Sequence, residues 1–448
     1  MLFDTIVAQA TASGIAALNI IRVSGMDAIS LVDKIIQGPH LEQMKSHQIV
    51  YAHVVDQEEI IDEVMVSVFR EPRSFTRENM VEITCHGGLI VSSEIIKLLI
   101  RHGARLAEPG EFSKRAFIHG RIDLTMAEGI VDVVEAKTRE QLILAQKSIS
   151  GDIKAKVDAF QSTLLEMIGI IEVNIDYPEY DDVLSMTGTI LKPKLESLIN
   201  DIDAIIRASE RGKIVREGLS VVIVGKPNVG KSSLLNSLLK EERAIVTDVS
   251  GTTRDLIEAE MNLDGLLVKL IDTAGIRKTE DVVETIGVNR AKKAIDTADL
   301  VLLVVDQSDS LTDLDSDLLE LTKTKKRILV GNKIDLGRKH DFAPEHVVDI
   351  SAKNKIGLDD LAQKIREMFL ESSTTSSDLL FANERHVGII QQARDQIGDA
   401  LDAIHAHMPI DLIVIDLHGA WESLGEITGK STTETLIDHL FASFCLGK

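Results

Sequence analysis

Apolar and polar residues follow three different patterns along this chain, and each pattern predicts a different kind of structure. From about residue 1 to 118, short runs typical of β-strands at 17–23, 64–69 and 80–85 are mixed with a helical run at 92–102. This first region is therefore expected to be an α+β domain.

The second region, from about 119 to 215, has the periodicity of an α-helix. Its apolar positions are spaced by about 3.6 residues on average, which is the helical repeat. We predict one helical run that continues through Gly151 and closes at Pro178. The apolar positions are Leu142, Ala145, Ile149, Ile153, Val157, Phe160, Leu164, Ile168 and Ile171.

The third region, from about 218 to 370, alternates strand-like runs with helices, which is typical of a mostly parallel sheet. Its longest apolar run, Leu300–Val305, predicts a buried parallel strand. The other strand-like runs are 220–225, 267–272, 327–331 and 347–350.

A polar segment at 371–377 separates this region from a second helical stretch. Because helical patterns lie on both sides of the α/β region, the simplest topology is an α/β domain inserted into a helical domain. The returning helical positions are Ile390, Ala393, Ile397, Leu401 and Ile404, and the predicted parts are 1–118, 119–215, 216–373 and 374–448. The predicted fold class is α/β plus α.

Composition narrows the class of protein. The 448 residues are 44 % hydrophobic and 27 % charged, which excludes a largely disordered chain. The formal net charge of −22 argues against coating nucleic acid through bulk charge, although a local basic patch is compatible with it.

The intracellular environment is also predicted by composition. Two cysteines, Cys85 and Cys445, are too few for a disulfide framework and favour a reducing cytosol. We expect no secretory signal and no membrane span, because no apolar run approaches about 20 residues. Cys85 is expected in the core, and His405 and His407 are expected to be solvated.

A phosphate-binding loop is the most specific chemical signal. Gly225–Ser232 reads G-K-P-N-V-G-K-S, follows an apolar strand and precedes a helix expected over 233–240. Backbone N–H groups of such a loop surround phosphate oxygens. Lys231 is expected to reach the β- and γ-phosphates, and Ser232 to ligate Mg²⁺.

Three further motifs each follow a strand, as nucleotide-site residues do in open α/β sheets. In Asp272–Gly275, the carboxylate of Asp272 suits the outer coordination shell of Mg²⁺. The N–H of Gly275 suits the γ-phosphate. The carboxylate of Asp335 in Asn332–Asp335 accepts two hydrogen bonds from guanine, a donor pair that adenine lacks. Ser351–Lys353 would close the pocket around the guanine oxygen. The motifs together predict a Ras-like P-loop domain that binds GTP.

The residue that activates water is not evident from these motifs. Ras-type GTPases place a glutamine directly after D-x-x-G, and this chain has Ile276 there. Either another side chain compensates or an external activator acts on a slow switch. The nearby candidates are Arg254, Asp255, Arg277, Glu280, Asp281 and Glu284.

The motif order resembles the tRNA modification GTPase MnmE (TrmE) family, and the resemblance runs nearly end to end. The segments that carry it are 4–8, 21–25, 86–88, 109–117, 247–255, 424–429 and 444–448. The resemblance implies a folate-binding-like N-terminal domain and extends the nucleotide set. The GTP-binding residues are then Asn228, Val229, Gly230, Lys231, Ser232, Ser233, Thr247, Asp248, Val249, Ser250, Gly251, Thr252, Thr253, Asp272, Thr273, Ala274, Gly275, Asn332, Lys333, Asp335, Ser351 and Ala352.

The same resemblance implies two cations and a homodimer whose GTPase domains meet during turnover. K⁺ would be held by Asn228, Thr247, Val249 and Thr252, and Mg²⁺ by Ser232 and Thr253. A monovalent cation beside the phosphates neutralises developing charge as an arginine finger does. Glu284 would position the attacking water, whereas without the family it would be interpreted as a solvated residue.

In the N-terminal domain the resemblance implies binding of a tetrahydrofolate derivative of the 5-formyl or methylene type. Arg22, Glu82, Arg121 and Lys448 would contact it; the alternative from sequence alone is a surface salt bridge. Cys445 would be a candidate catalytic thiol, the alternative being an inert buried cysteine.

This chain departs from the family pattern around the folate. Most of the usual Pro and Gly residues are missing from 11–17. Segment 74–79 differs from the usual Tyr-Thr-Gly-Glu-Asp, and Arg121 replaces a frequent Lys. These changes bear on folate affinity more than on GTP chemistry.

The resemblance implies a potassium-dependent GTPase that works in the cytoplasm with the FAD-carrying protein MnmG. Together they would build an aminomethyl-type group on carbon 5 of the wobble uridine of certain tRNAs. Two alternatives remain at this point: a ribosome-assembly GTPase that binds RNA, and a GTP-gated interaction switch.

Overall fold

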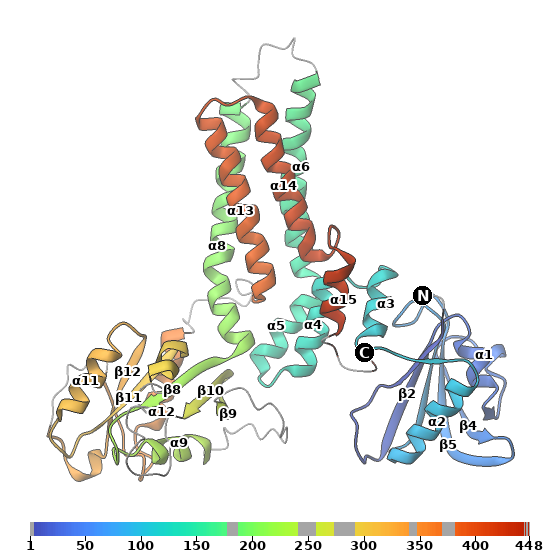
Figure 1. Ribbon diagram of the computed structural model, residues 1–448, viewed down its shortest axis with the longest axis horizontal. Coiled ribbons are helices and arrows are strands. Elements are labelled where there is room, and N and C mark those ends of the chain that lie inside the picture. The colour runs from blue at the N-terminus through green and yellow to red at the C-terminus, as the bar shows by residue number, and fades with distance from the viewer. Residues whose placement is uncertain are drawn as a thin grey trace. The chain divides into compact units, whose positions relative to one another are not determined.

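The computed structural model describes residues 4–176, 187–240, 257–272, 292–339, 347–369, 381–442, 444 and 447. The chain divides into two compact units. Unit 1 comprises residues 1–131, 154–162 and 421–448, and unit 2 comprises residues 132–153 and 163–420. Figure 1 shows the elements of both units.

Unit 1 contains a seven-stranded sheet in the order β3-β4-β5-β6-β2-β1-β7. All its strand pairs are antiparallel except β1 with β7. The strands are β1 (Ile6–Gln9), β2 (Leu18–Ser24), β3 (Ile36–Gln37), β4 (Gln48–Asp56), β5 (Glu59–Phe69), β6 (Met80–His86) and β7 (Arg105–Leu106). The predicted runs at 17–23, 64–69 and 80–85 thus correspond to β2, β5 and β6.

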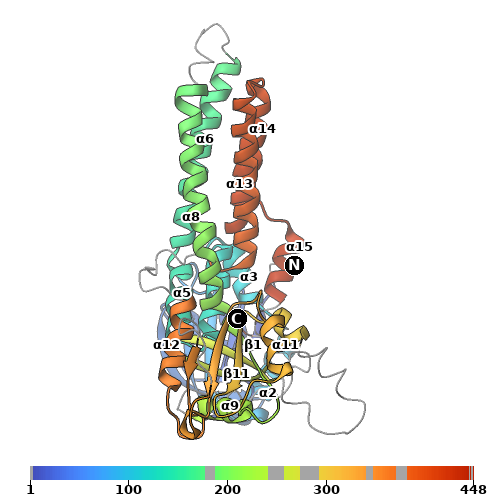
Figure 2. The same ribbon diagram turned by 90° about the vertical axis from the view of Figure 1, so that its left-hand side faces the viewer.

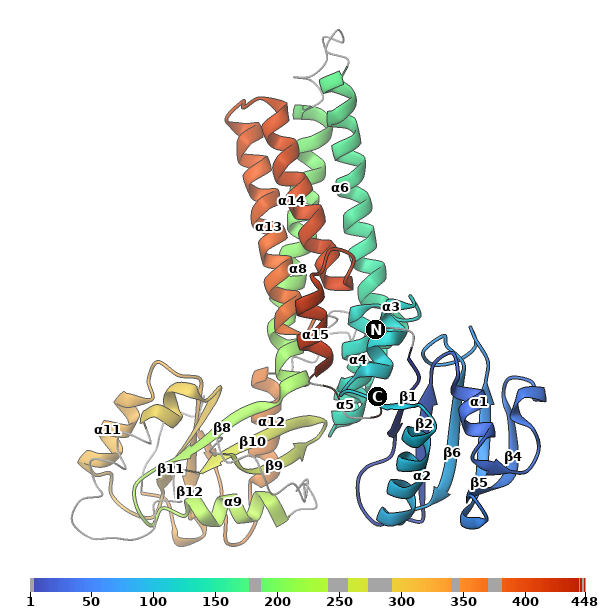
Figure 3. The same ribbon diagram turned by 45° about the vertical axis from the view of Figure 1, so that its right-hand side comes forward.

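Helices α1 (Ala28–Asp33) and α2 (Leu89–Arg101) cover one face of this sheet, as Figure 3 shows. Apolar residues of both helices pack on alternate residues of the strands, Cys85 among them, and burial raises the pKa of its thiol. The prediction that Cys85 lies in the core is therefore confirmed.

The opposite face of the same sheet carries the polar candidates. Phe112 of α3 (Glu111–Ile118) packs there on residues of β1. Arg22 of β2 and Glu82 of β6 lie on this face as cross-strand neighbours. The unit also contains the first part of α4 (Leu124–Glu135) and α15 (Glu434–Ala442).

Unit 2 contains a six-stranded sheet in the order β13-β12-β11-β8-β10-β9. Its strands are β8 (Leu219–Val224), β9 (Ile257–Leu263), β10 (Leu266–Asp272), β11 (Leu300–Asp306), β12 (Arg327–Asn332) and β13 (Val347–Asp349). β11 is buried throughout and lies between parallel β8 and β12, which confirms the prediction for the apolar run. β9 pairs antiparallel with β10 and was not predicted.

Helices cover both faces of this sheet, as expected for a parallel α/β domain. α9 (Lys231–Lys240) and α12 (Leu358–Phe369) pack on one face. α11 (Asp313–Leu321) and the helical residues 292–297 pack on the other.

The sheet lies in the sequence between two long helices that pack on one another, α8 (Lys192–Glu217) and α13 (Glu384–His405). Figure 2 shows α8 and α13 running along each other. Insertion of an α/β domain into a helical domain, with an α+β region before it, is therefore confirmed. The other long helices are α6 (Asp152–Asp176) and α14 (Ile410–Thr428).

The predicted continuous helix from Leu142 to Ile171 is wrong at one point. α5 (Arg139–Ser150) ends at Gly151, whose φ of 90° lies in the left-handed region, and α6 begins at the next residue. Glycine adopts this conformation without the steric cost that a Cβ would add, so it ends helices while the apolar spacing continues.

Candidate nucleotide and folate sites

The predicted phosphate-binding loop connects β8 to α9, and two of its glycines permit close backbone contacts. A Cβ on Gly225 would overlap the carbonyl oxygen of Val304, and one on Gly230 would overlap Nδ2 of Asn332. Gly230 also has a φ of 100°. Only glycine fits these positions, so the loop can curl at the N-terminus of α9 where anions bind.

The polar residues of the loop are arranged for a phosphate ligand. The Nζ of Lys231 donates hydrogen bonds to the carbonyl oxygens of Gly225 (2.8 Å) and Lys226 (2.9 Å), so it lies across the loop. Ser232 and Ser233 are exposed in the first turn of α9, and Asn228 is exposed with a left-handed φ of 64°. The hydroxyl of Ser232 is therefore accessible to a metal ion bound with phosphate.

Asn332 joins the phosphate loop to the predicted base pocket. It is 3 % exposed at the end of β12; its Nδ2 donates to the carbonyl oxygen of Val229 (2.7 Å), and its Oδ1 accepts from the N–H of Ala352 (3.0 Å). One buried amide thus links three of the predicted motifs. This role follows from the fold, since the carboxyl ends of parallel strands meet at one edge.

Asp335 is held beside the base pocket by a hydroxyl. The Oγ of buried Ser351 donates to Oδ1 of Asp335 at 2.6 Å, while Asp335 itself is exposed. This bond engages one carboxylate oxygen and orients the group. The geometry suits recognition of two neighbouring N–H groups on guanine.

Lys333 forms an ion pair that sequence analysis missed. Its Nζ lies 2.6 Å from Oδ2 of Asp306 at the end of β11. Burial raises the pKa of Asp306, but hydrogen bonds from Lys333 and Ser308 outweigh it and hold that pKa below its usual value. The available signal was an aspartate directly after an apolar strand.

Several predicted site residues lie outside the described residues. They are Thr247, Asp248, Val249, Ser250, Gly251, Thr252, Thr253, Thr273, Ala274, Gly275, Glu284, Cys445 and Lys448. Asp272 ends β10, and its side chain is also outside them. Their roles stay predictions.

The three described folate candidates lie together in unit 1, on the sheet face opposite α1 and α2. They line a cavity of about 570 Å³ with Ser74 and Phe75. Arg22 and Glu82 form an ion pair at 2.8 Å, and the guanidinium of Arg121 lies 5.3 Å from the centre of the Phe75 ring. The salt-bridge alternative is thus realised within a cavity and does not exclude a binding role.

Arg22 has further contacts that fix its position. Its Nη1 donates to the carbonyl oxygen of Gly447 at 3.2 Å, so Gly447 lies beside this arginine of the cavity. Its guanidinium also lies 5.6 Å from the ring centres of both Phe75 and Phe112. A cation between aromatic rings is held by their negative faces.

A buried charge network supports the loop that lines this cavity. Arg115 is 1 % exposed and forms ion pairs with Asp4 (2.8 Å), Glu78 (3.0 Å) and Glu111 (2.9 Å). Burial raises the pKa of Glu111, but hydrogen bonds from Arg105 and Arg115 keep it below its usual value. Glu78 belongs to the 74–79 segment, so the network fixes the conformation of that segment. In the sequence, the 109–117 motif indicated the family and gave no sign of this role.

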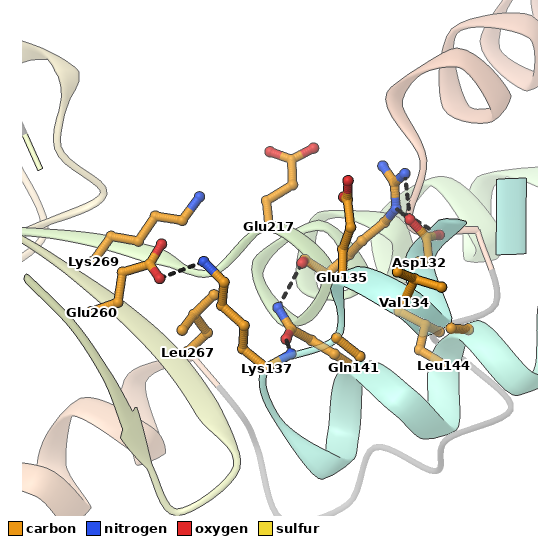
Figure 4. Close-up of a pocket in the computed structure, with 13 residues that line it drawn as sticks. Asp132, Val134, Glu135, Lys137, Gln141, Leu144, Glu217, Glu260, Leu267 and Lys269 are labelled. Atoms are coloured by element: carbon orange, nitrogen blue, oxygen red, sulfur yellow. Dashed lines mark hydrogen bonds and ion pairs between the residues drawn. The ribbon is translucent and has the colours of Figure 1, made fainter. Parts of the chain in front are cut away.

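A second cavity, of about 750 Å³, lies in unit 2 beside the β9–β10 hairpin (Figure 4). Lys137 pairs with Glu260 of β9, Arg216 pairs with Asp132 at 2.9 Å, and Gln141 donates to the carbonyl oxygen of Arg216 at 2.8 Å. The hairpin lies in sequence between two predicted nucleotide loops. The Lys137–Glu260 ion pair therefore connects the hairpin to the link between α4 and α5, while the Arg216–Asp132 pair joins α8 to α4.

Comparison with known proteins covers the whole chain. The family model of the MnmE helical domain matches residues 124–445, and that of the TrmE N-terminus matches residues 5–121. Curated tRNA modification GTPases MnmE from Bacillus mycoides and Bacillus cereus are each 49 % identical over 100 % of both chains. The chain belongs to the MnmE family of tRNA modification GTPases. It is accordingly a GTPase enzyme.

Solved structures of P-loop GTPases are also similar to part of this MnmE-family chain. A crystal structure of Era from Aquifex aeolicus is 28 % identical, covering 40 % of this chain and 66 % of that chain with a TM-score of 0.28. The G domain of the Thermotoga maritima transporter FeoB is 31 % identical, covering 33 % of this chain and 97 % of that one with a TM-score of 0.26.

Membrane and metal signals are absent from the part of the chain that the structure describes. None of the described helices combines the length and apolar character that a membrane crossing requires. Within the same residues, no group of three or more His, Cys, Asp or Glu side chains is placed to hold a metal ion. His405 and His407 are exposed, as predicted for solvated residues.

Proposed function

We propose that this chain is a potassium-dependent GTPase that, with the flavoprotein MnmG, modifies carbon 5 of the wobble uridine of certain tRNAs. The one-carbon unit would come from a tetrahydrofolate derivative, and the FAD would be on the partner only. The observation that carries this proposal is similarity at 49 % identity over the whole length of named tRNA modification GTPases. It covers both the GTP motifs and the folate candidates.

The GTP site fits its ions and its base. Lys231 would hold the β- and γ-phosphates, Ser232 and Thr253 would hold Mg²⁺, and Asp335 would select guanine. The exposed hydroxyl of Ser232 at the start of α9 supports the Mg²⁺ assignment. Bound Mg²⁺ would supply charge neutralisation at the phosphates.

The potassium site and the water-positioning residue rest on the family pattern. Asn228 would hold K⁺ together with Thr247, Val249 and Thr252, and its exposed side chain on the phosphate loop supports this. Glu284 would orient the attacking water in place of the missing glutamine. Bound K⁺ would neutralise charge that develops in the transition state.

The cavity in unit 1 fits a folate. Glu82 offers a carboxylate to the amide-like donor face of a pterin, Phe75 offers an aromatic face, and Arg121 offers a cation. Arg22 fixes the position of the Glu82 carboxylate. Lys448 and Cys445 would approach from the C-terminal segment, to which Gly447 belongs, with Cys445 as the candidate thiol.

The remaining proposals concern assembly and location. A homodimer is supported by exposed apolar residues on β4 and β5, on the sheet face opposite α1 and α2: Ile49, Tyr51 and Met65 are 61 %, 54 % and 44 % exposed. We place the protein in the cytoplasm, with tRNA as substrate and MnmG in a hetero-oligomer. The four-part division at 118, 215 and 373 is likewise a proposal.

The alternative functions explain less of the chain. A ribosome-assembly GTPase or a GTP-gated switch would use the phosphate loop and Asp335 but would not need the arginine-lined cavity. Folate binding by the full chain separates these possibilities. We favour tRNA modification because the family match includes the N-terminal region at 5–121.

The test is mass spectrometry of nucleosides in tRNA from cells that lack this gene. We expect loss of carbon-5 aminomethyl-type wobble uridines, restoration by the intact gene and no restoration by Lys231→Ala. Restoration by Cys445→Ser would keep the function and exclude an essential thiol. Unchanged uridines in the deletion strain would reject the proposal in favour of the assembly-type GTPase.

A second measurement tests the ion. GTP turnover by the purified protein should be faster in KCl than in NaCl at equal ionic strength, because K⁺ would stabilise the transition state. Equal rates in the two salts would reject the potassium site while leaving GTP hydrolysis intact. Glu284→Ala should lower kcat with little change in nucleotide affinity.

A further inference from the structure

The folate cavity is lined by more positive charge than its proposed pterin site requires. Its lining includes four arginines, Arg22, Arg73, Arg77 and Arg121, and one carboxylate, Glu82. The chain as a whole carries a net charge of −22. A local cationic surplus in an acidic protein indicates an anionic ligand at this place.

Two of these arginines are already engaged. Arg22 pairs with Glu82 and donates to the carbonyl oxygen of Gly447. Arg121 lies against the ring of Phe75 and donates to the carbonyl oxygen of Ser74. Their contacts position them toward the aromatic, pterin-binding part of the cavity.

The other two arginines are available. Arg73 is exposed, and its side chain has no hydrogen bond or ion pair with another described residue. Arg77 is also exposed, and its Nη1 donates to the carbonyl oxygen of His119 at 2.8 Å. A guanidinium carries five donors, so this bond orients Arg77 and leaves donors for a carboxylate.

The backbone at Arg77 is unusual for a residue with a side chain. Its φ is 61°, in the left-handed region that favours glycine. An arginine in this conformation costs about 1 kcal/mol relative to glycine. Glu78, tied to buried Arg115, and Ser74, whose Oγ donates to the carbonyl oxygen of Glu78, hold the loop in this shape.

We propose that Arg73 and Arg77 bind the carboxylates of a polyglutamate tail, so that this chain takes polyglutamylated folate in preference to the monoglutamate. This inference rests on the proposed folate function. Each γ-linked glutamate adds one carboxylate beyond the pterin, and both arginines line the same cavity as Glu82 and Phe75. Bidentate pairing of guanidinium with carboxylate makes such a contact charge-assisted.

The experiment measures the affinity of the full-length protein for 5-formyltetrahydrofolate with one, three and five glutamates, by calorimetry at low and moderate salt. The wild type should bind the triglutamate roughly tenfold more tightly than the monoglutamate. Salt should weaken this preference. The double variant Arg73→Ala with Arg77→Gly should reduce the ratio to near one, and glycine suits the backbone at 77.

Arg101→Ala is the matched control. Arg101 belongs to α2, which covers the other face of the same sheet, and it forms an ion pair with Asp56 of β4. It does not line the cavity. It should keep the wild-type ratio. Circular dichroism melting curves of each variant exclude loss of folding as the cause.

Three results would overturn the proposal. A wild-type ratio near one with clear monoglutamate binding would reject the tail contact and leave the folate function intact. No binding of any folate form by folded protein would reject the folate function and the inference together. If tail length has no effect but the double variant weakens tRNA binding, the two arginines bind nucleic-acid phosphates instead.

Discussion

At the scale of single residues, several candidate site side chains are held in place by residues from other segments. Asn332 holds two nucleotide motifs together, Ser351 orients Asp335, and Arg22 fixes Glu82. In each case the partner comes from another segment of the chain. Substitution at these positions should therefore change binding specificity or stability in ways that the local sequence does not indicate.

Asp335→Asn should change the base that the enzyme prefers. A carboxylate accepts from both guanine donors, whereas an amide offers one acceptor and one donor, which suits the carbonyl at carbon 2 of xanthine. We expect GTP affinity to fall about 100-fold and affinity for xanthosine triphosphate to rise. Titration with fluorescent nucleotides measures both. The exposed Asp317→Asn on α11 is the control, and an unchanged GTP affinity in Asp335→Asn would contradict the base assignment.

Glu111→Gln should destabilise unit 1 in a pH-dependent way. The pKa of Glu111 is held below its usual value, so the charged carboxylate stabilises the fold at any pH above the usual glutamate pKa. This stabilisation is lost as the pH falls through the lowered pKa. We expect a loss of about 2 kcal/mol at pH 7, because Arg115 keeps its other partners. Urea unfolding at pH 7 and in acid measures the difference, which should shrink in acid. Glu94→Gln, at a half-exposed position on α2, should have little effect at either pH.

Among helices and strands, glycine decides where the apolar period is interrupted. Gly151 has a left-handed φ of 90° and ends α5, while Gly169 lies inside α6 with open space within 4 Å of the position that a Cβ would take. The two glycines look alike in the sequence, but the backbone at Gly151 requires glycine and the helix at Gly169 accepts a residue with a Cβ. Their substitution by alanine should therefore have opposite effects.

Gly151→Ala should lower the free energy of unfolding by about 1 kcal/mol, since alanine is strained at positive φ. Gly169→Ala should raise it by about 1 kcal/mol, because it reduces the entropy lost by a helical glycine. Thermal melts followed by circular dichroism measure both changes. Equal effects of the two substitutions would show that the break at Gly151 does not depend on its backbone conformation.

For the molecule as a whole, the candidate GTP site and the proposed folate cavity lie in separate parts of the sequence. Charge is also distributed unevenly: the chain has a net charge of −22, but four arginines line this one cavity. Much of the tRNA affinity would then lie on the partner flavoprotein. Self-association through the exposed surface of β4 and β5 would be the second level of assembly.

Tyr51→Asp with Met65→Asp should dissociate the proposed homodimer. The two residues are register partners on β4 and β5, and both are exposed on the face opposite α1 and α2. Burying two unpaired carboxylates in an apolar interface costs more free energy than the association of the two surfaces provides. Light scattering after size-exclusion chromatography gives the mass of the particle. Ile100→Asp on α2, 42 % exposed, is the control, and a dimer that survives the double substitution places the interface elsewhere.

Local patterns in the chain were sufficient to predict many of the elements and the binding of GTP. Periodicity predicted the buried strand Leu300–Val305 and the helices around the inserted sheet, because alternation and 3.6-residue spacing are local properties. The order of the G motifs predicted GTP, since each motif follows its own strand. The residues of the folate candidates came from the family pattern, and the chain offered no local reason for them.

What these residues do to one another depends on the three-dimensional fold. The antiparallel β9, the break at Gly151, the buried Arg115 network and the bridging amide of Asn332 depend on backbone conformation or on contacts between segments far apart in the chain. Sequence patterns record which face of an element is apolar but not which distant side chain it meets. For the same reason the sequence predicted no role for Arg73 and Arg77, and the role proposed for them rests on the fold, which places both in one cavity with Glu82.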